Sequence, residues 1–153
     1  MATAAQASST DREAHVSTPD LPTRVAAVRK VAAKYEGKPF AYGTADCIRL
    51  ARSTLVALGA KGLPRTPRYT SEKTALRRLA EAGHESLESL IAAHATPIPA
   101  SRALPGDLGI LPGAGALRAC VVYAGNGLWL GWHAAYPGGL RAVRVGVEQV
   151  FRV

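Results

Sequence analysis

Cysteine is scarce in this chain, and its scarcity excludes two classes of small protein. Only Cys47 and Cys120 occur among 153 residues, and they do not form a C-x-x-C pair. A zinc ribbon needs four closely spaced ligands, and a disulfide scaffold needs several cysteines, so the sequence predicts neither. A single bridge between Cys47 and Cys120 stays open as an alternative.

Long apolar runs and clustered metal ligands are also missing. No stretch approaches the roughly 18 consecutive apolar residues of a membrane span. Residues 1–10 lack the basic start and apolar centre of a secretory signal. The histidines do not have metal-ligand spacing to one another, to cysteine or to a carboxylate. We therefore expect no membrane span, no metal and no cofactor.

Acidic residues are few relative to basic ones, and the formal net charge is +8. This charge is typical of a solvated basic surface, and equally of contact with a polyanion or with an acidic protein partner. The Arg and Lys residues are spread along the chain rather than gathered in a basic run with interleaved aromatic side chains. That pattern argues against a nucleic-acid partner.

The first twenty residues differ in composition from the rest of the chain. Residues 1–20 are rich in Ala, Ser and Thr and hold few large apolar side chains. Because such a segment buries little apolar surface, we expect a flexible arm, which can order against a neighbouring subunit. Residues 21–153 are long enough for a single domain with its own core.

Apolar spacing predicts helices in the first half of this domain. Asp20 and Pro22 are typical of a helix start, and Gly37 is typical of a helix end. The expected apolar stripe of this helix consists of Leu21, Val25, Val28, Ala32 and Tyr35. Further helices are predicted over residues 45–58, 71–82 and 87–93.

The second half of the domain favours strands. Gly and Pro residues separate short strands predicted over residues 107–111, 117–124, 128–133, 140–145 and 147–152. The segment Gly125-Asn126-Gly127 indicates a hairpin. Helices followed by antiparallel strands predict an α+β fold, with N-terminal helices packed on a C-terminal antiparallel sheet.

Cys47 stands near the start of the second predicted helix, on its apolar face. Backbone N–H groups and the helix dipole favour a thiolate at such a position. A cysteine nucleophile also needs oxyanion donors, part of which the Cys47 N–H and Tyr42 can supply, and a base from a strand packed across the helix start. The alternative is that Cys47 is a small buried apolar side chain.

Three segments resemble the NlpC-type papain-like cysteine peptidases. Tyr42-Gly43-x-x-Asp46-Cys47 resembles their nucleophile motif, Gly106-Asp107-Leu108 resembles the turn that opens their sheet, and residues 121–127 resemble the following strand and hairpin. The resemblance implies a papain-like fold. It also implies cleavage of bacterial cell-wall peptides by a Cys, a His and a third polar residue.

A closer resemblance is to a branch of this family found in tailed-phage and prophage tail gene clusters. The shared features are Leu21-Pro22, the Pro39-Phe40-x-Tyr42-Gly43-x-x-Asp46-Cys47 approach, the Arg68-Tyr69 loop and the ending at residues 150–153. This resemblance implies a virion tail protein that is assembled in the host cytoplasm. The partners that this resemblance implies are other tail proteins. Bacterial murein peptide is a further candidate partner.

The chain departs from the family at the position of the base. Active members carry a histidine at the start of the second strand, and the matching position before Gly125 is Ala119, with Cys120 beside it. The tail-associated branch shows the same loss. His133 resembles the third polar residue of the family, with a longer spacing, and can contact Cys47 directly or through water. The alternative is a strand histidine that is bonded locally.

The sequence therefore leaves two functions of different class open. The first is a structural or assembly component of a phage-like tail, in the tail tip region, with impaired catalysis because Ala119 replaces the histidine. The second is an active cysteine peptidase or amidase that cleaves cell-wall peptides during phage entry, with Cys47, His133, Tyr42 and Asp46 as site residues. For Asp46, the alternative to a catalytic role is capping of the helix.

Overall fold

The helices occupy the first part of the domain, as the apolar spacing predicts. The computed structural model describes residues 18–61, 67–113 and 115–153, so nearly all of the expected arm lies outside the described residues. Among the described residues, the α-helices are α2 (Leu21–Tyr35), α3 (Cys47–Ala57), α4 (Glu72–Glu81) and α5 (Leu87–Ala92). A short 3-10 helix, η1 (Ala100–Arg102), lies between the first two strands.

The strands form one antiparallel sheet of six. They are β1 (Thr96–Ile98), β2 (Leu108–Ile110), β3 (Cys120–Gly125), β4 (Leu128–Gly131), β5 (Arg141–Val143) and β6 (Gln149–Arg152). Their spatial order is β1-β6-β2-β3-β4-β5, and every neighbouring pair is antiparallel. The predicted α+β class, with helices first and antiparallel strands second, is confirmed.

One strand is missing from the sequence prediction. Pro97 lies in β1, and proline argues against a strand because it cannot donate to a ladder. β1 stands at the edge of the sheet and pairs only with β6, so one side of it needs no donor. All five predicted strands form and each is shorter than predicted, with β3 ending one residue later, at Gly125. The Gly125-Asn126-Gly127 hairpin joins β3 to β4 with positive φ at all three residues.

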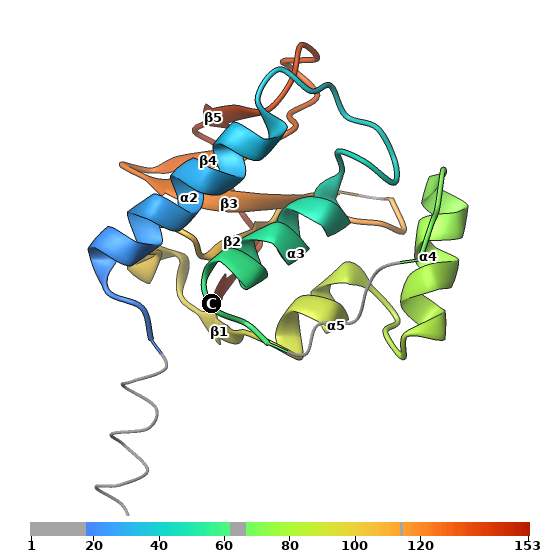
Figure 1. The fold of residues 1–153 in the computed structure, drawn as a ribbon, viewed down its shortest axis with the longest axis horizontal. Coiled ribbons are helices and arrows are strands. Elements are labelled where there is room, and N and C mark those ends of the chain that lie inside the picture. Colours follow the sequence, from blue (N-terminus) through green and yellow to red (C-terminus); the bar gives the residue numbers. More distant parts are fainter. Residues whose placement is uncertain (1–17, 62–66, 114) are drawn as a thin grey trace, which may run out of the picture.

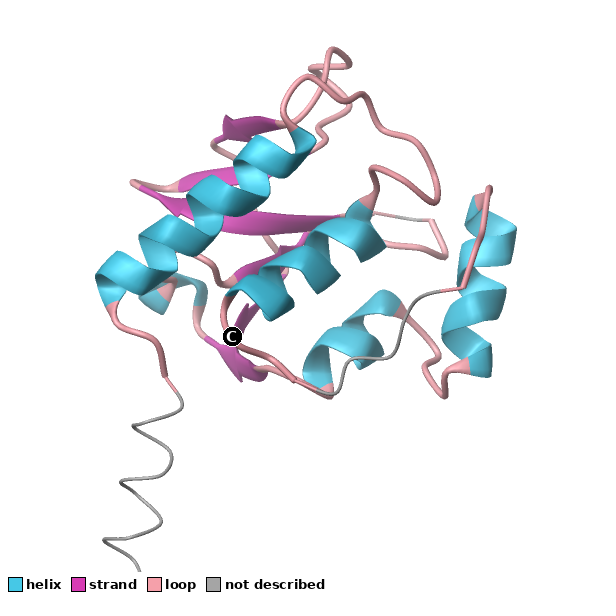
Figure 2. Cartoon of the chain, viewed as in Figure 1, coloured by secondary structure: helices cyan, strands magenta, loops and turns pink. Residues whose placement is uncertain are grey.

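α2 and α3 lie side by side over one face of the sheet, and α4 and α5 lie beyond α3 (Figure 1; Figure 2). The strand β3 runs beneath both long helices and contacts each of them. Its side chains alternate between two apolar clusters, as the strand period requires. Cys120 and Val122 belong to the main core under the helices, whereas Val121 packs with Trp129 and Val150 on the opposite face.

The buried face of α2 differs from the predicted stripe. Leu21 is 54% exposed, while Arg24 is completely buried together with Ala27, Val28, Val31 and Tyr35. The helix start itself is as predicted, because the Asp20 side chain accepts from the Thr23 N–H. The stripe is wrong at its N-terminal end because a buried arginine, rather than Leu21, faces the domain there.

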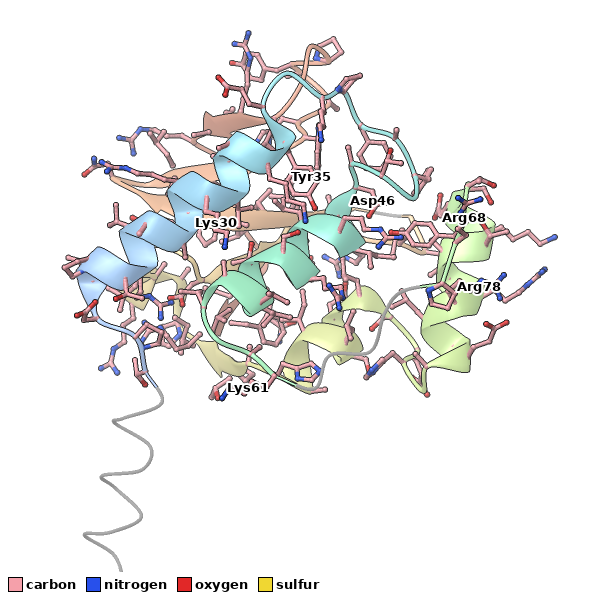
Figure 3. The ribbon with its side chains drawn as sticks, viewed as in Figure 1. Lys30, Tyr35, Asp46, Lys61, Arg68 and Arg78 are labelled. Atoms are coloured by element: carbon pink, nitrogen blue, oxygen red, sulfur yellow. The ribbon has the colours of Figure 1, made fainter. Side chains whose placement is uncertain are left out.

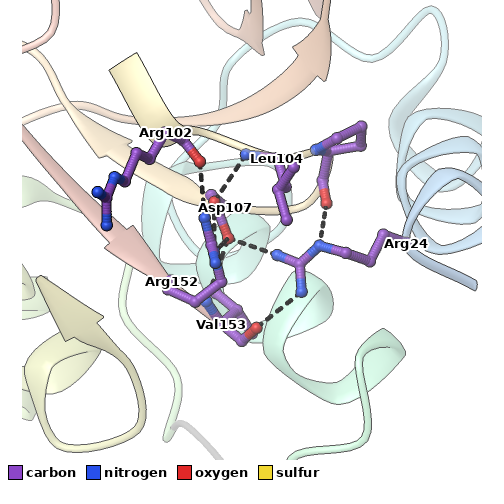
Figure 4. Close-up of polar contacts among 7 residues, drawn as sticks. Arg24, Arg102, Leu104, Asp107, Arg152 and Val153 are labelled. Atoms are coloured by element: carbon purple, nitrogen blue, oxygen red, sulfur yellow. Dashed lines mark hydrogen bonds and ion pairs between the residues drawn. The ribbon is translucent and has the colours of Figure 1, made fainter. Parts of the chain in front are cut away.

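The partner of Arg24 is the carboxylate of Asp107, which is also fully buried (Figure 4). Arg152 donates from Nε to Asp107 Oδ2 at 2.9 Å, and the Leu104 N–H donates to the same oxygen at 2.8 Å. Arg24 also donates to the carbonyls of Pro105 at 2.8 Å and Val153 at 2.9 Å. This Asp107 network therefore joins α2 to the turn before β2 and to the end of β6.

No helix within residues 18–61, 67–113 and 115–153 combines the length and apolarity needed to cross a bilayer.

Candidate functional site

Asp46 caps α3, the role that competes with catalysis in the sequence prediction. Its side chain is buried, accepts from the Arg49 N–H at 2.9 Å, and accepts from the Gly43 N–H at 2.6 Å. Figure 3 shows Asp46 at the end of α3 that faces the loop after α2. An N-cap carboxylate of this kind satisfies helix N–H groups that have no other partner. Both oxygens of Asp46 are therefore committed to structure.

Tyr69 supplies a further donor to the same carboxylate. Its hydroxyl lies 2.8 Å from Asp46 Oδ1 and 2.7 Å from Oδ2, and its ring is buried. Burial and the neighbouring Asp46 charge raise the pKa of Tyr69, so the hydroxyl stays protonated and remains a donor. The Arg49 guanidinium lies 5.5 Å from the centre of the Tyr69 ring. Asp46 thus ties the loop around Tyr69 to the start of α3.

Gly43 allows the two loops to approach closely. Its φ is +89°, a left-handed conformation that side chains with a Cβ rarely adopt. A Cβ placed there would lie 2.2 Å from the Tyr69 carbonyl oxygen. The glycine of the Tyr42-Gly43 motif is therefore required by packing against the Tyr69 backbone.

The prediction of a thiolate-favouring environment for Cys47 is wrong. Cys47 is the first residue of α3, as expected, but its side chain is buried with only 7% of its surface exposed. Its pKa is raised from 9.0 to about 11, chiefly by burial; the hydrogen bond from the Cys120 N–H lowers it, and the Asp46 carboxylate raises it. Removal from water disfavours the charged form more strongly than the helix start favours it. The thiol is therefore protonated near neutral pH.

The start of β3 faces this thiol. The backbone N–H of Cys120 hydrogen-bonds to Cys47, and the Ala119 carbonyl accepts from Leu111 N–H at 2.9 Å in the ladder between β2 and β3. Both cysteines are free and buried, and burial raises the pKa of Cys120 well above its usual value. The strand predicted to carry the base thus meets Cys47 with a backbone amide and a second neutral thiol.

His133 lies just beyond β4 and is buried. Its Nε2 donates a hydrogen bond of 3.0 Å to the Trp129 carbonyl, four residues earlier in the chain. This is the local bond that the sequence leaves as the alternative to a catalytic role. The groups that shift the pKa of Cys47 are the Cys120 amide and the Asp46 carboxylate.

Tyr42 stands between the candidate site and an aromatic cluster. Burial raises its pKa, with further contributions from Glu72, Cys47 and Asp46, so its hydroxyl stays neutral. Its ring packs edge-on against Phe40 at 4.9 Å between centres. Phe40 in turn meets Trp132 at 5.9 Å, and the Trp132 Nε1 donates to the Lys38 carbonyl at 2.9 Å. The approach to Cys47 is therefore fixed to the segment after β4.

We expect Asp46→Ala to lower the free energy of unfolding by about 3 kcal/mol, because it removes a cap and leaves the buried Tyr69 hydroxyl without its acceptor. Asp46→Asn keeps an oxygen for the cap and should cost less. The matched control is Ser86→Ala, which removes the cap of α5 alone, where the Ser86 hydroxyl accepts from the Ser89 N–H. Urea unfolding followed by circular dichroism gives the values, and equal losses for Asp46→Ala and Ser86→Ala would contradict this account of Asp46.

The described residues hold no group of three or more His, Cys, Asp or Glu side chains that could bind a metal ion.

The sequence analysis missed the roles of two residues. Arg24 was left out because the predicted apolar stripe of its helix does not include it, and Tyr69 bonds to Asp46, which is 23 residues away in the chain. The family resemblance includes the Arg68-Tyr69 loop, so it draws attention to Tyr69. It does not reveal that Tyr69 bonds to Asp46.

Comparison with known proteins gives one family assignment. No curated protein and no solved structure matches the chain. The sequence model of the family described as Domain of unknown function (DUF6950) matches residues 19–153, which include every helix and strand described above. The chain therefore belongs to the DUF6950 domain family.

Proposed function

We propose that this protein is an assembly component of a phage-like tail, in the tail tip region, built on an NlpC-type papain-like scaffold that has lost its peptidase chemistry. The observation that carries the loss of chemistry is the state of Cys47. Its thiol is buried, its pKa is raised to about 11, the matching position for the family's histidine is Ala119, and the neighbouring Cys120 supplies only a backbone amide. A neutral thiol is a poor nucleophile.

The other candidate catalytic groups support the same proposal. Asp46 uses both oxygens to hold Gly43, Arg49 and Tyr69, and His133 donates to the Trp129 carbonyl. These groups are engaged in bonds within the fold, and none of these bonds leads to Cys47. The residues that match the nucleophile motif therefore stabilise the fold of the domain rather than catalyse a reaction.

The tail location rests on sequence resemblance. The segments that resemble the tail-associated branch are Leu21-Pro22, the approach to Cys47, the Arg68-Tyr69 loop and residues 150–153. In the fold, the approach to Cys47 packs on the Arg68-Tyr69 loop through Gly43 and Tyr69, and the ending at residues 150–153 is bonded to α2 through Val153 and Arg24. We propose that the protein is assembled in the host cytoplasm and carried in the virion, with other tail proteins as partners.

An active peptidase or amidase that cleaves murein peptides during entry is the second candidate. The observation in its favour is the placement of Cys47 at the start of α3, with β3 packed against that helix. A cysteine nucleophile needs this arrangement, and it also needs a base.

The test is incorporation into tail particles. Particles purified from a host that produces the tail are analysed by quantitative mass spectrometry, with the wild-type chain and with Cys47→Ala. We expect the chain at a fixed ratio to other tail proteins, and the same ratio and infectivity for Cys47→Ala, because the thiol serves no reaction. Absence of the wild-type chain from particles would refute the assembly role. Normal assembly with lost infectivity and lost murein cleavage in Cys47→Ala would establish the peptidase instead.

A further inference from the structure

A groove runs between α2 and α3 on the side of these helices away from the sheet. It has a volume of about 370 Å³ and is lined by Lys30, Val31 and Lys34 from α2 and by Arg52, Ser53, Val56 and Ala57 from α3. Figure 3 shows Lys30 on the side of α2 that faces α3. Contacts between Lys34 and Ser53 at 3.1 Å, and between the Tyr35 hydroxyl and Ser53 at 2.8 Å, hold the two helices together beside it.

The rim of this α2–α3 groove carries charge of one sign. Its lining includes three cationic side chains, Lys30, Lys34 and Arg52, and no carboxylate. Lys30 and Lys34 are exposed and stand four residues apart, so they lie one turn apart on the same face of α2. Such a rim attracts a partner with carboxylates at matching helical spacing.

The floor of the groove is apolar. Val31, Val56 and Ala57 line it; Val31 is buried, and Val56 is 48% exposed although cations line the same groove. The described lining contains no aromatic side chain on which a nucleic-acid base could stack. An apolar floor with a basic rim is complementary to a helix that presents an apolar stripe between rows of acidic residues.

We propose that the α2–α3 groove is a docking surface for an acidic amphipathic helix of another protein. The inference rests on the assembly role proposed above and names the chemistry of one assembly partner. The apolar stripe of that helix covers Val56 and Ala57, and its carboxylates pair with Lys30 and Lys34. The net charge of +8 adds long-range attraction to the same partner.

The experiment uses a fluorescein-labelled synthetic peptide with a leucine stripe flanked by glutamates, and a matched peptide with glutamine in place of glutamate. Binding to the full chain is measured by fluorescence anisotropy at low and high salt. The groove variant is Lys30→Glu with Lys34→Glu. The matched control is Lys73→Glu with Arg77→Glu, which reverses the same charge at the same spacing on the exposed face of α4.

We expect the acidic peptide to bind the wild-type chain and to bind the groove variant at least about tenfold more weakly, with little change for the α4 control. Val56→Ser should also weaken binding, because it removes the apolar contact. No binding by the wild-type chain, equal weakening in both double variants, or equal affinity for the glutamine peptide would overturn the proposal. Tighter binding of a DNA duplex to the same groove would overturn the choice of partner.

This assay is independent of the test of the assembly role. It measures binding of a peptide, whereas the particle experiment measures incorporation of the chain. A chain that enters particles but does not bind the acidic peptide would refute the groove and leave the assembly role standing. A chain absent from particles would refute the assembly role whatever the peptide does.

Discussion

Arg24→Met should lower the free energy of unfolding by about 3–5 kcal/mol, the largest loss expected from a single substitution outside the apolar core. Arg24 is fully buried and donates to Asp107 and to the carbonyls of Pro105 and Val153. Methionine fills similar space but makes none of these hydrogen bonds, and a buried carboxylate that loses one of its two cations is costly. Urea unfolding followed by circular dichroism measures the loss.

The control for Arg24→Met is Arg78→Met on α4. Arg78 pairs with Glu81 at 2.8 Å, and both side chains are substantially exposed, so its loss should cost less than about 1 kcal/mol. Arg24→Lys should have a free energy of unfolding between those of the wild type and Arg24→Met. Lysine keeps the charge but cannot reach three acceptors with the fixed geometry of a guanidinium. Equal losses for Arg24→Met and Arg78→Met would show that the Asp107 network does not hold α2 to the sheet.

Gly43→Ala should lower the free energy of unfolding by about 3 kcal/mol or more, because alanine meets both a backbone penalty and a steric clash. The left-handed φ of +89° accounts for the first, and the Tyr69 carbonyl oxygen, 2.2 Å from the position of the new Cβ, accounts for the second. Relief of the clash moves the Tyr69 backbone and so weakens the bond between Tyr69 and Asp46. Thermal and urea unfolding both report the change.

Gly37→Ala separates the two contributions. Gly37 has a φ of +69°, and a Cβ there has no heavy atom within 4 Å. Its substitution should therefore cost only the backbone penalty of about 1 kcal/mol. If Gly43→Ala were no more destabilising than Gly37→Ala, the close contact between Gly43 and the Tyr69 backbone would not be a constraint on this fold.

Local sequence signals were enough to predict the order of the four helices and of the strands from β2 to β6, but not β1. The spacing of apolar residues, the caps at Asp20 and Asp46 and the Gly125-Asn126-Gly127 hairpin are local signals, and the structure contains each of these features. Local signals determine where a helix begins or a chain turns, because the atoms involved are a few residues apart. The α+β class follows from the order of these elements.

The interactions that position the site are not local. Arg24 and Asp107 are 83 residues apart, and Tyr69 and Asp46 are 23 residues apart. An arginine on a helix normally lies on its solvated side, so the apolar stripe placed Leu21 in the core and left Arg24 outside it. Only the fold shows that Arg24 is buried because it pairs with Asp107.

The protonation state of Cys47 could not be predicted from the sequence either. The sequence places the thiol at a helix start, where the dipole lowers the pKa, but it does not reveal how much water reaches the sulfur. In the fold the main core covers Cys47 from the side of β3, and burial determines the sign of the shift. The position of the thiol is predictable from sequence, and its protonation state is not.

The pH titration of the Cys47 thiol tests the central claim most directly. The ¹³C shift of labelled cysteine Cβ reports protonation without requiring a reagent to enter the core, and Cys47→Ala assigns the resonance. Because burial stabilises the neutral thiol, we predict that Cys47 remains protonated through neutral pH and titrates near pH 11. Titration below the usual value of 9.0, as a prepared nucleophile would show, would contradict a scaffold without peptidase chemistry.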